Sequence, residues 1–228
     1  MTTPATTAVS TLNEQQSTTR AIWLWCEILL LFVGTPLLMY EGLVPNWPIL
    51  YLLVATIGVL FVLRADRSFD PGLLVRHSGL AAGFTKLLLR DAPLVLVLGL
   101  AVWLFSSQLL FSLVKSAPGI WFLVVIFYPI FSVYPQELVY RAYFFHRYRP
   151  IFGSDTRMIV ANALLFGFVH IIFGSWISVS LTAIGGVLFG LTYRKSGSLL
   201  LACLEHALFG DFIFTIGLGR YFYLLTHR

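Results

Sequence analysis

Charged side chains are scarce in this sequence: they make up 11% of its 228 residues, whereas 58% are hydrophobic and 16% are aromatic. Soluble domains carry roughly 25% charged residues, so the composition excludes an ordinary soluble globular fold. Four runs are free of Asp, Glu, Lys and Arg, and each is long enough to cross a bilayer because one crossing takes about 20 residues. These runs are residues 42–63, 92–114, 116–136 and 158–193. The sequence therefore predicts an integral membrane protein.

The sequence also has only two cysteines, and its first 20 residues do not look like a cleavable signal peptide. The two cysteines, Cys26 and Cys203, are not spaced like metal ligands, which argues against a disulfide scaffold or a zinc knuckle. Residues 1–20 are rich in Thr and Ser and contain no apolar core of a cleavable signal peptide. We expect them to form a disordered cytoplasmic tail, followed by a single transmembrane domain over residues 21–228.

Long apolar runs fix the fold class. Only helices and closed barrels satisfy the backbone inside lipid, and these runs are too long for barrel strands. The sequence predicts an all-α polytopic membrane bundle of seven transmembrane helices, or eight if residues 64–91 enter the bilayer. The run 158–193 has 36 residues and must turn once, which Phe173-Gly174-Ser175-Trp176 indicates. Gly186 and Gly190 form a small-residue face that lets a neighbouring helix approach closely.

Basic residues indicate the orientation. They gather in the connections 64–91 and 137–157 and at Arg194 and Lys195, so these connections and the N-terminus are predicted to be cytoplasmic. Leucines alternate with basic residues in 64–91, which predicts an amphipathic helix in the cytoplasmic interface. Topology thus explains the net charge of +5, and nothing indicates a nucleic-acid partner.

A few ionisable residues fall inside the predicted spans. Each costs about 2.5 to 3.5 kcal/mol at the middle of a membrane helix, so such residues usually face the bundle interior and mark functional sites. A plain ion pair or a hydrogen-bonded packing histidine is the alternative for any one of them. They come from three different C-terminal spans: Glu137, Arg141, His170, Glu205, His206 and Asp211. If Glu137 is to share a pocket with the two histidines, the fourth helix must continue through Tyr143.

The order and spacing of these residues resemble the CPBP intramembrane endopeptidases, the group of CAAX prenyl protease type II, bacteriocin-processing and Abi proteins. The resemblance covers residues 92–218. The first family motif, Glu-Glu-x-x-x-Arg, corresponds to residues 136–141, the second to Phe166 and His170, and the third to His206. It implies an endopeptidase that uses activated water and no cofactor on a peptide or lipidated peptide, from a site open to the cytoplasmic side of a bacterial inner membrane.

Two positions depart from the family pattern. The first glutamate, which the family uses as general base, is Gln136 here, and an amide cannot accept that proton. The third motif usually has Asn four residues after its histidine, whereas this chain has Gly210, followed by Asp211. The catalytic machinery is therefore either rearranged or lost.

A rearranged site still has the groups that hydrolysis requires. Glu137, oriented by Arg141, or Glu205 could act as base with His170, while His206 stabilises the oxyanion and Gln136 positions water. Phe166 and Asp211 are further expected contacts of the substrate or the oxyanion. Three alternatives remain open: zinc held by His170 and His206, a noncatalytic membrane binding or scaffold protein, and a proton-coupled transporter.

Overall fold

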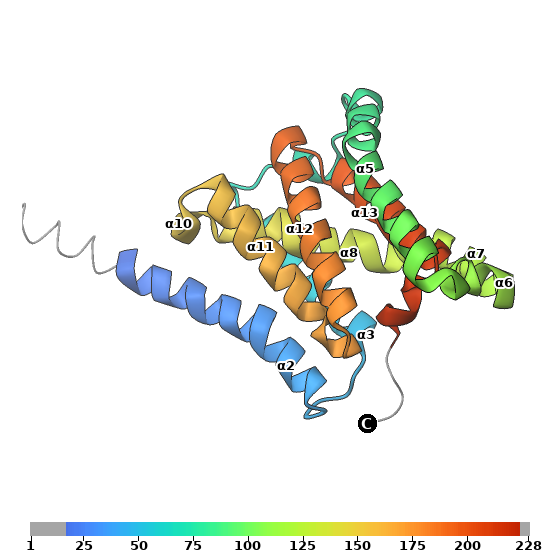
Figure 1. The fold of residues 1–228 in the computed structure, drawn as a ribbon. Coiled ribbons are helices and arrows are strands. Elements are labelled where there is room, and N and C mark those ends of the chain that lie inside the picture. Colours follow the sequence, from blue (N-terminus) through green and yellow to red (C-terminus); the bar gives the residue numbers. More distant parts are fainter. Residues whose placement is uncertain (1–16, 224–228) are drawn as a thin grey trace, which may run out of the picture.

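The computed structural model describes residues 17–223, and within that range every regular element is a helix (Figure 1). This confirms the all-α polytopic bundle. Six helices are long and apolar enough to cross a membrane: Ser17–Tyr40, Pro48–Ala65, Leu80–Ser116, Pro118–Arg147, Asp155–Phe173 and Trp176–Ser196. A further apolar helix, Leu199–Thr215, has 17 residues, so the expected count of seven to eight spans is not confirmed.

Several of these helices are built from shorter elements. In chain order the elements are η1 (Leu29–Gly34), α2 (Thr35–Tyr40), α3 (Pro48–Ala65), α4 (Gly72–Val75), α5 (Leu80–Ser106), η2 (Ser107–Leu109), α6 (Ser112–Ser116), α7 (Pro118–Tyr128), η3 (Pro129–Val133), α8 (Tyr134–Glu137), η4 (Leu138–Tyr143), α9 (Phe144–Arg147), α10 (Arg149–Phe152), α11 (Asp155–Val169), η5 (His170–Phe173), α12 (Trp176–Ser196), α13 (Leu199–Thr215) and η6 (Leu218–Phe222). Here η1, η3 and η4 are π-helical and η2, η5 and η6 are 3₁₀.

Two boundary predictions are wrong. Residues 64–91 do not form one interfacial helix: α4 is a single turn, and residues 80–91 are the first half of α5, which runs on through Pro93. The basic residues of this segment suggested that an interfacial helix ends near residue 91 and a transmembrane helix begins after it, but the helix is continuous there. The first helix begins at Ser17, so residues 17–20 are helical rather than part of a disordered tail. Residues 1–16 of the predicted tail lie outside the described range.

Helices α11 and α12 form a tight hairpin near the centre of the bundle (Figure 1). The predicted turn is confirmed, since α12 starts at Trp176 and Gly174 has a φ of 64°, which favours glycine. A Cβ at Gly186 would lie 2.8 Å from the Cα of Ala163. The small-residue face therefore lets the two helix backbones come together, as the sequence predicts.

The helix Pro118–Arg147 is continuous and includes the two π-helical stretches η3 and η4. Pro129 and Pro135 cannot donate backbone hydrogen bonds, so local rearrangement of the helical ladder is expected there. Asn162 of α11 donates to the carbonyl oxygen of Tyr140 at 2.6 Å, inside the second π-helical stretch. The helix thus continues past Tyr143, the condition for placing Glu137 among the other polar groups.

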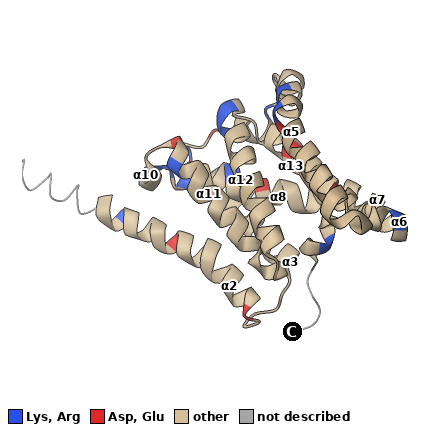
Figure 2. Cartoon of the chain, viewed as in Figure 1, with Lys and Arg blue, Asp and Glu red and all other residues tan. Residues whose placement is uncertain are grey.

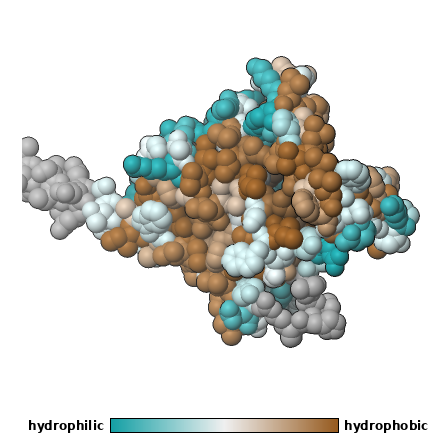
Figure 3. All heavy atoms as spheres, viewed as in Figure 1, coloured by the Kyte–Doolittle hydropathy of each residue, from teal (hydrophilic) through white to brown (hydrophobic). Residues whose placement is uncertain are grey.

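Many of the Lys and Arg residues lie along one edge of the molecule, around α10, the end of α12 and the beginning of α5 (Figure 2). Apolar residues cover most of the visible face below that edge (Figure 3). Large apolar side chains such as Trp103, Phe105 and Leu89 are more than half exposed, which suits contact with lipid. The charged edge agrees with the predicted basic connections, while the cytoplasmic orientation itself stays a prediction.

Candidate functional site

Glu137, Arg141 and His206 meet at the centre of the bundle. His206 of α13 donates from Nδ1 to Glu137 Oε1 at 2.9 Å, because a carboxylate oxygen can only accept. Arg141 Nε lies 3.2 Å from Glu137 Oε2, so the two side chains form an ion pair without a hydrogen bond between these atoms. Glu137 and Arg141 have no exposed surface. The carboxylate therefore links a buried guanidinium to an imidazole on another helix.

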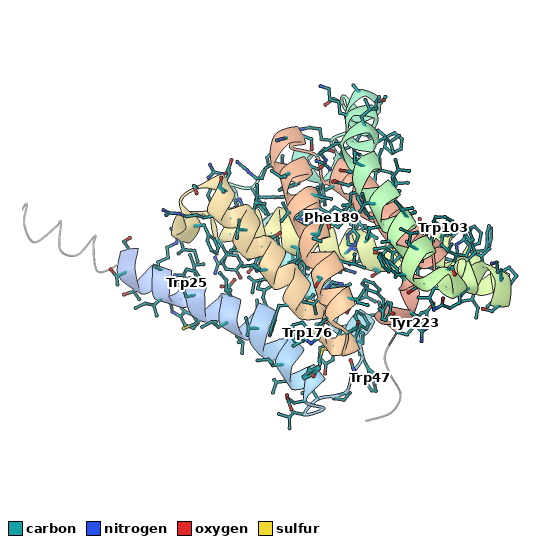
Figure 4. The ribbon with its side chains drawn as sticks, viewed as in Figure 1. Trp25, Trp47, Trp103, Trp176, Phe189 and Tyr223 are labelled. Carbon is teal, nitrogen blue, oxygen red and sulfur yellow. The ribbon has the colours of Figure 1, made fainter. Side chains whose placement is uncertain are left out.

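Aromatic rings surround the Arg141 guanidinium. Its central carbon is 4.7 Å from the ring centroid of Phe166 and 5.6 Å from that of Phe189. Such cation–π contacts stabilise a cation that has left water. Phe189, near the centre of Figure 4, also stacks on His206 with centroids 4.6 Å apart. These two phenylalanines hold both the arginine and the imidazole in place.

His170 lies where α11 gives way to the 3₁₀ turn η5. Its Nδ1–H donates to the carbonyl oxygen of Phe166 at 2.7 Å, which leaves Nε2 with a lone pair. The Ser178 hydroxyl donates to the backbone oxygen of Ser175 at 2.7 Å and also lies 3.4 Å from that of His170, so it contacts both ends of the turn. Phe166 contacts both imidazoles, with centroids 5.1 Å from His170 and 5.5 Å from His206. Both imidazoles thus lie against one phenylalanine ring.

A cavity of about 790 Å³ runs between α5, α7, α12, α13 and the last turn of the described chain. Its wall is mostly leucine, isoleucine and phenylalanine, and Tyr223 lines it near the C-terminal end (Figure 4). No Asp, Glu, Lys or Arg of the described residues lines it. The polar groups on its wall include the side chains of Tyr128, Ser132, Gln136, His170, Thr182 and His206. An apolar, neutral cavity with two imidazoles suits a membrane-derived ligand.

Glu137 and Arg141 do not reach the cavity wall, because His206 and the two phenylalanines lie between them and the cavity. Phe166 does line it, as expected of a substrate contact. Gln136 lines it too, and its Nε2 donates to Ser132 Oγ at 2.6 Å on the same helix. The structure therefore brings six of the predicted residues together but arranges them in two layers, with Glu137 and Arg141 behind the four that line the cavity.

Glu205 points elsewhere. Its carboxylate pairs with Arg90 of α5, which also contacts Asp91 at 2.7 Å and Thr192 at 3.1 Å. Glu205 directly precedes His206 and is therefore turned about 100° around the helix. Asp211 does not line the cavity either. The geometry does not support Glu205 as the base or Asp211 as an oxyanion contact.

Tyr128, the last residue of α7, is the contact that the sequence analysis did not anticipate. Its hydroxyl lies 3.0 Å from His206 Nε2, and its ring packs against Gly210. It lies eight residues before Gln136, about two helical turns, and this spacing alone does not single it out among the aromatic residues of the run. The space beside Gly210, where the related family usually carries an Asn side chain, is taken by this tyrosine.

The zinc alternative stays a prediction, and the described residues give it no assembled donor set. Glu137 and Tyr128 engage the two ring nitrogens of His206, and a metal ligand needs one of them free. No group of three or more His, Cys, Asp and Glu side chains suited to a metal ion occurs between residues 17 and 223. The donor set that the zinc alternative requires is therefore not assembled.

A helical membrane bundle with an ion pair, two imidazoles and an apolar cavity at its core defines a polytopic membrane protein with a buried polar site. Residues 116–210 match the family model of the type II CAAX prenyl endopeptidase Rce1-like proteins. This confirms the resemblance to the CPBP endopeptidases over less than half of the chain, a segment that contains Gln136, Glu137, Arg141, His170 and His206. The matched family is a protease family. No curated protein and no solved structure shows significant similarity to the chain.

Proposed function

We propose that the protein is an intramembrane endopeptidase that hydrolyses a peptide bond of a membrane-associated substrate with activated water. The observation that carries this proposal is that His170 and His206, from different helices, line one apolar cavity, while the buried Glu137–Arg141 pair holds His206 from behind. A lone packing histidine would need neither the second imidazole nor the ion pair. The match to a protease family supports the same conclusion.

His170 is the proposed general base. Its Nδ1–H is held by the backbone, so Nε2 can accept a proton from water. The water oxygen then bonds to the carbonyl carbon, whose π electrons move to the carbonyl oxygen. When the tetrahedral intermediate collapses, the C–N bond breaks and the proton on His170 passes to the leaving nitrogen. Gln136 accepts no proton in this scheme, but its amide oxygen can hold the water.

Glu137 is a positioning residue in this proposal. It lies behind His206, away from the cavity, and accepts the Nδ1–H that fixes the orientation of the ring. Arg141 keeps the carboxylate in place from the other side. This differs from a base role for Glu137, which would require the carboxylate to reach the reacting water.

The neutral cavity wall favours an apolar substrate segment. A peptide or lipidated peptide that enters from the bilayer would bury apolar surface against the leucine and phenylalanine side chains. The basic edge in Figure 2 supports a cytoplasmic side for that end of the bundle, with the N-terminus inside. That the membrane is a bacterial inner membrane is proposed from the family resemblance alone. No cofactor is required by the proposed chemistry.

One observation favours a second candidate function. Gln136 stands where the family has its glutamate base, and its amide nitrogen is bonded to Ser132. A family member without that acid could keep the cavity and bind a membrane partner as a scaffold without cleaving it. The two candidates predict opposite results for Gln136→Glu.

The test is a cleavage assay on the full chain reconstituted in liposomes. The probe is an internally quenched peptide with an S-farnesyl cysteine followed by three apolar residues, compared with the same peptide without farnesyl. We expect cleavage by the wild type, a loss of about 10²- to 10⁴-fold in His170→Ala, and no change in the control His77→Ala, an exposed histidine outside the cavity. Cleavage that survives His170→Ala overturns the proposed mechanism. If the wild type is inactive and Gln136→Glu cleaves the peptide, the second candidate function is correct: the protein is a family member that has lost its catalytic activity.

A further inference from the structure

Tyr128 occupies the position from which a donor could reach a substrate in the cavity. It ends α7, and its side chain crosses to α13, where the hydroxyl lies 3.0 Å from His206 Nε2. Since Nδ1 of His206 already carries the hydrogen given to Glu137, Nε2 of the neutral ring is an acceptor and the tyrosine hydroxyl donates to it. Tyr128, like His206, lines the cavity.

Gly210 makes this contact possible. A Cβ at position 210 would lie 2.3 Å from Tyr128 Cε1 and 2.5 Å from its hydroxyl oxygen, so any larger residue would displace the ring. Phe214 packs edge-on against the ring on the same helix, with centroids 5.6 Å apart. The tyrosine is therefore held in a fitted slot on α13 and its hydroxyl has a fixed position.

The contact changes which group meets the substrate. The Nε2 atom of His206 is engaged by the tyrosine hydroxyl, so a carbonyl oxygen in the cavity meets the hydroxyl rather than the imidazole. We propose that Tyr128 is the oxyanion donor of this site, and that His206, Glu137 and Arg141 form the chain that positions its hydroxyl. This inference rests on the proposed endopeptidase function.

The chemistry follows from the strengths of the two acceptors. Before reaction the hydroxyl donates to the neutral imidazole nitrogen. As water attacks, negative charge develops on the carbonyl oxygen, and a hydrogen bond to a charged acceptor is roughly twice as strong as a neutral one. The O–H therefore turns from Nε2 to the oxyanion by rotation about the C–O bond. The hydrogen stays on Tyr128 throughout and returns to Nε2 when the intermediate collapses.

The test compares Tyr128→Phe with Tyr134→Phe in the liposome assay with the farnesylated peptide. Tyr134 lies on the same continuous helix, is half-buried and does not line the cavity. Loss of one oxyanion donor typically lowers kcat by about 10²- to 10³-fold. We expect that loss in Tyr128→Phe with KM changed less than about threefold, and unchanged kinetics in Tyr134→Phe.

Gly210→Ala gives a second, independent variant. The added Cβ displaces the Tyr128 ring, so kcat should fall in the wild-type background but should not fall further in Tyr128→Phe, where the hydroxyl is already gone. Wild-type-like kcat in Tyr128→Phe overturns the inference while the proposed function stands. Additive losses in the double variant overturn it too. A wild type that cleaves neither peptide overturns the inference and the proposed function together.

Discussion

Removing only one partner of the buried Glu137–Arg141 pair should destabilise the protein strongly. Glu137→Gln keeps the shape of the side chain but leaves the Arg141 guanidinium with only the Phe166 and Phe189 rings as partners. Both members of the pair have no exposed surface, and breaking such a pair leaves an uncompensated buried charge that costs about 3–5 kcal/mol. Arg141→Met should cost a similar amount by stranding the carboxylate.

The double variant Glu137→Gln/Arg141→Met separates charge from packing. With both charges gone it should recover most of the loss, because an uncharged pair of similar volume is often neutral or stabilising. The free energy of unfolding is measured by denaturant titration in mixed micelles, with the exposed pair Arg194–Asp155 as control. Breaking that surface pair should cost no more than about 1 kcal/mol. Additive losses in the double variant would refute the reasoning, because they would show that the two charges do not depend on each other.

Three further outcomes follow. Gly186→Leu should destabilise the α11–α12 hairpin by about 1–3 kcal/mol in the same titration, because its Cβ meets the Ala163 backbone, whereas Gly58→Leu, which meets nothing within 4 Å, should not. Glu205→Gln should leave the kcat of peptide cleavage nearly unchanged, because Glu205 faces Arg90. A loss as large as that of His170→Ala would contradict this and indicate that Glu205 acts in catalysis. Glu137→Gln should lower kcat more than it raises KM, since Glu137 positions His206 without lining the cavity, and a pure KM effect would contradict this.

Much of the fold follows from the sequence because lipid restricts it severely. The turn at Gly174 and the close face at Gly186 were predictable, since an overlong apolar run must turn and small residues mark close helix contacts. The beginning of α5 was not. Basic residues before Ala92 look like an interfacial segment, but Arg90 is held by Thr192 of α12 and Glu205 of α13, partners that the local sequence does not show.

The site shows the same division. That Glu137, Arg141, His170 and His206 belong together follows from the cost of placing such groups in lipid. Which of them face the cavity depends on how each helix is rotated about its axis. The sequence does not fix that rotation where two ionisable residues are neighbours, as Glu205 and His206 are. Tyr128 could not be singled out either, because a tyrosine in an apolar run is common and its role depends on the lack of a side chain at Gly210, 82 residues later.

The central claim is that acid and imidazole from separate helices meet in the core of the bundle, and solid-state NMR in lipid bilayers tests it most directly. A carbon–nitrogen recoupling experiment on protein labelled at the glutamate carboxylate and the histidine ring would report the Glu137–His206 contact, with Glu137→Gln and His206→Gln to assign it. The structure places Nδ1 2.9 Å from the carboxylate oxygen, so strong dephasing is predicted. Absence of dephasing between these two residues would show that they do not meet, and would contradict the proposed site.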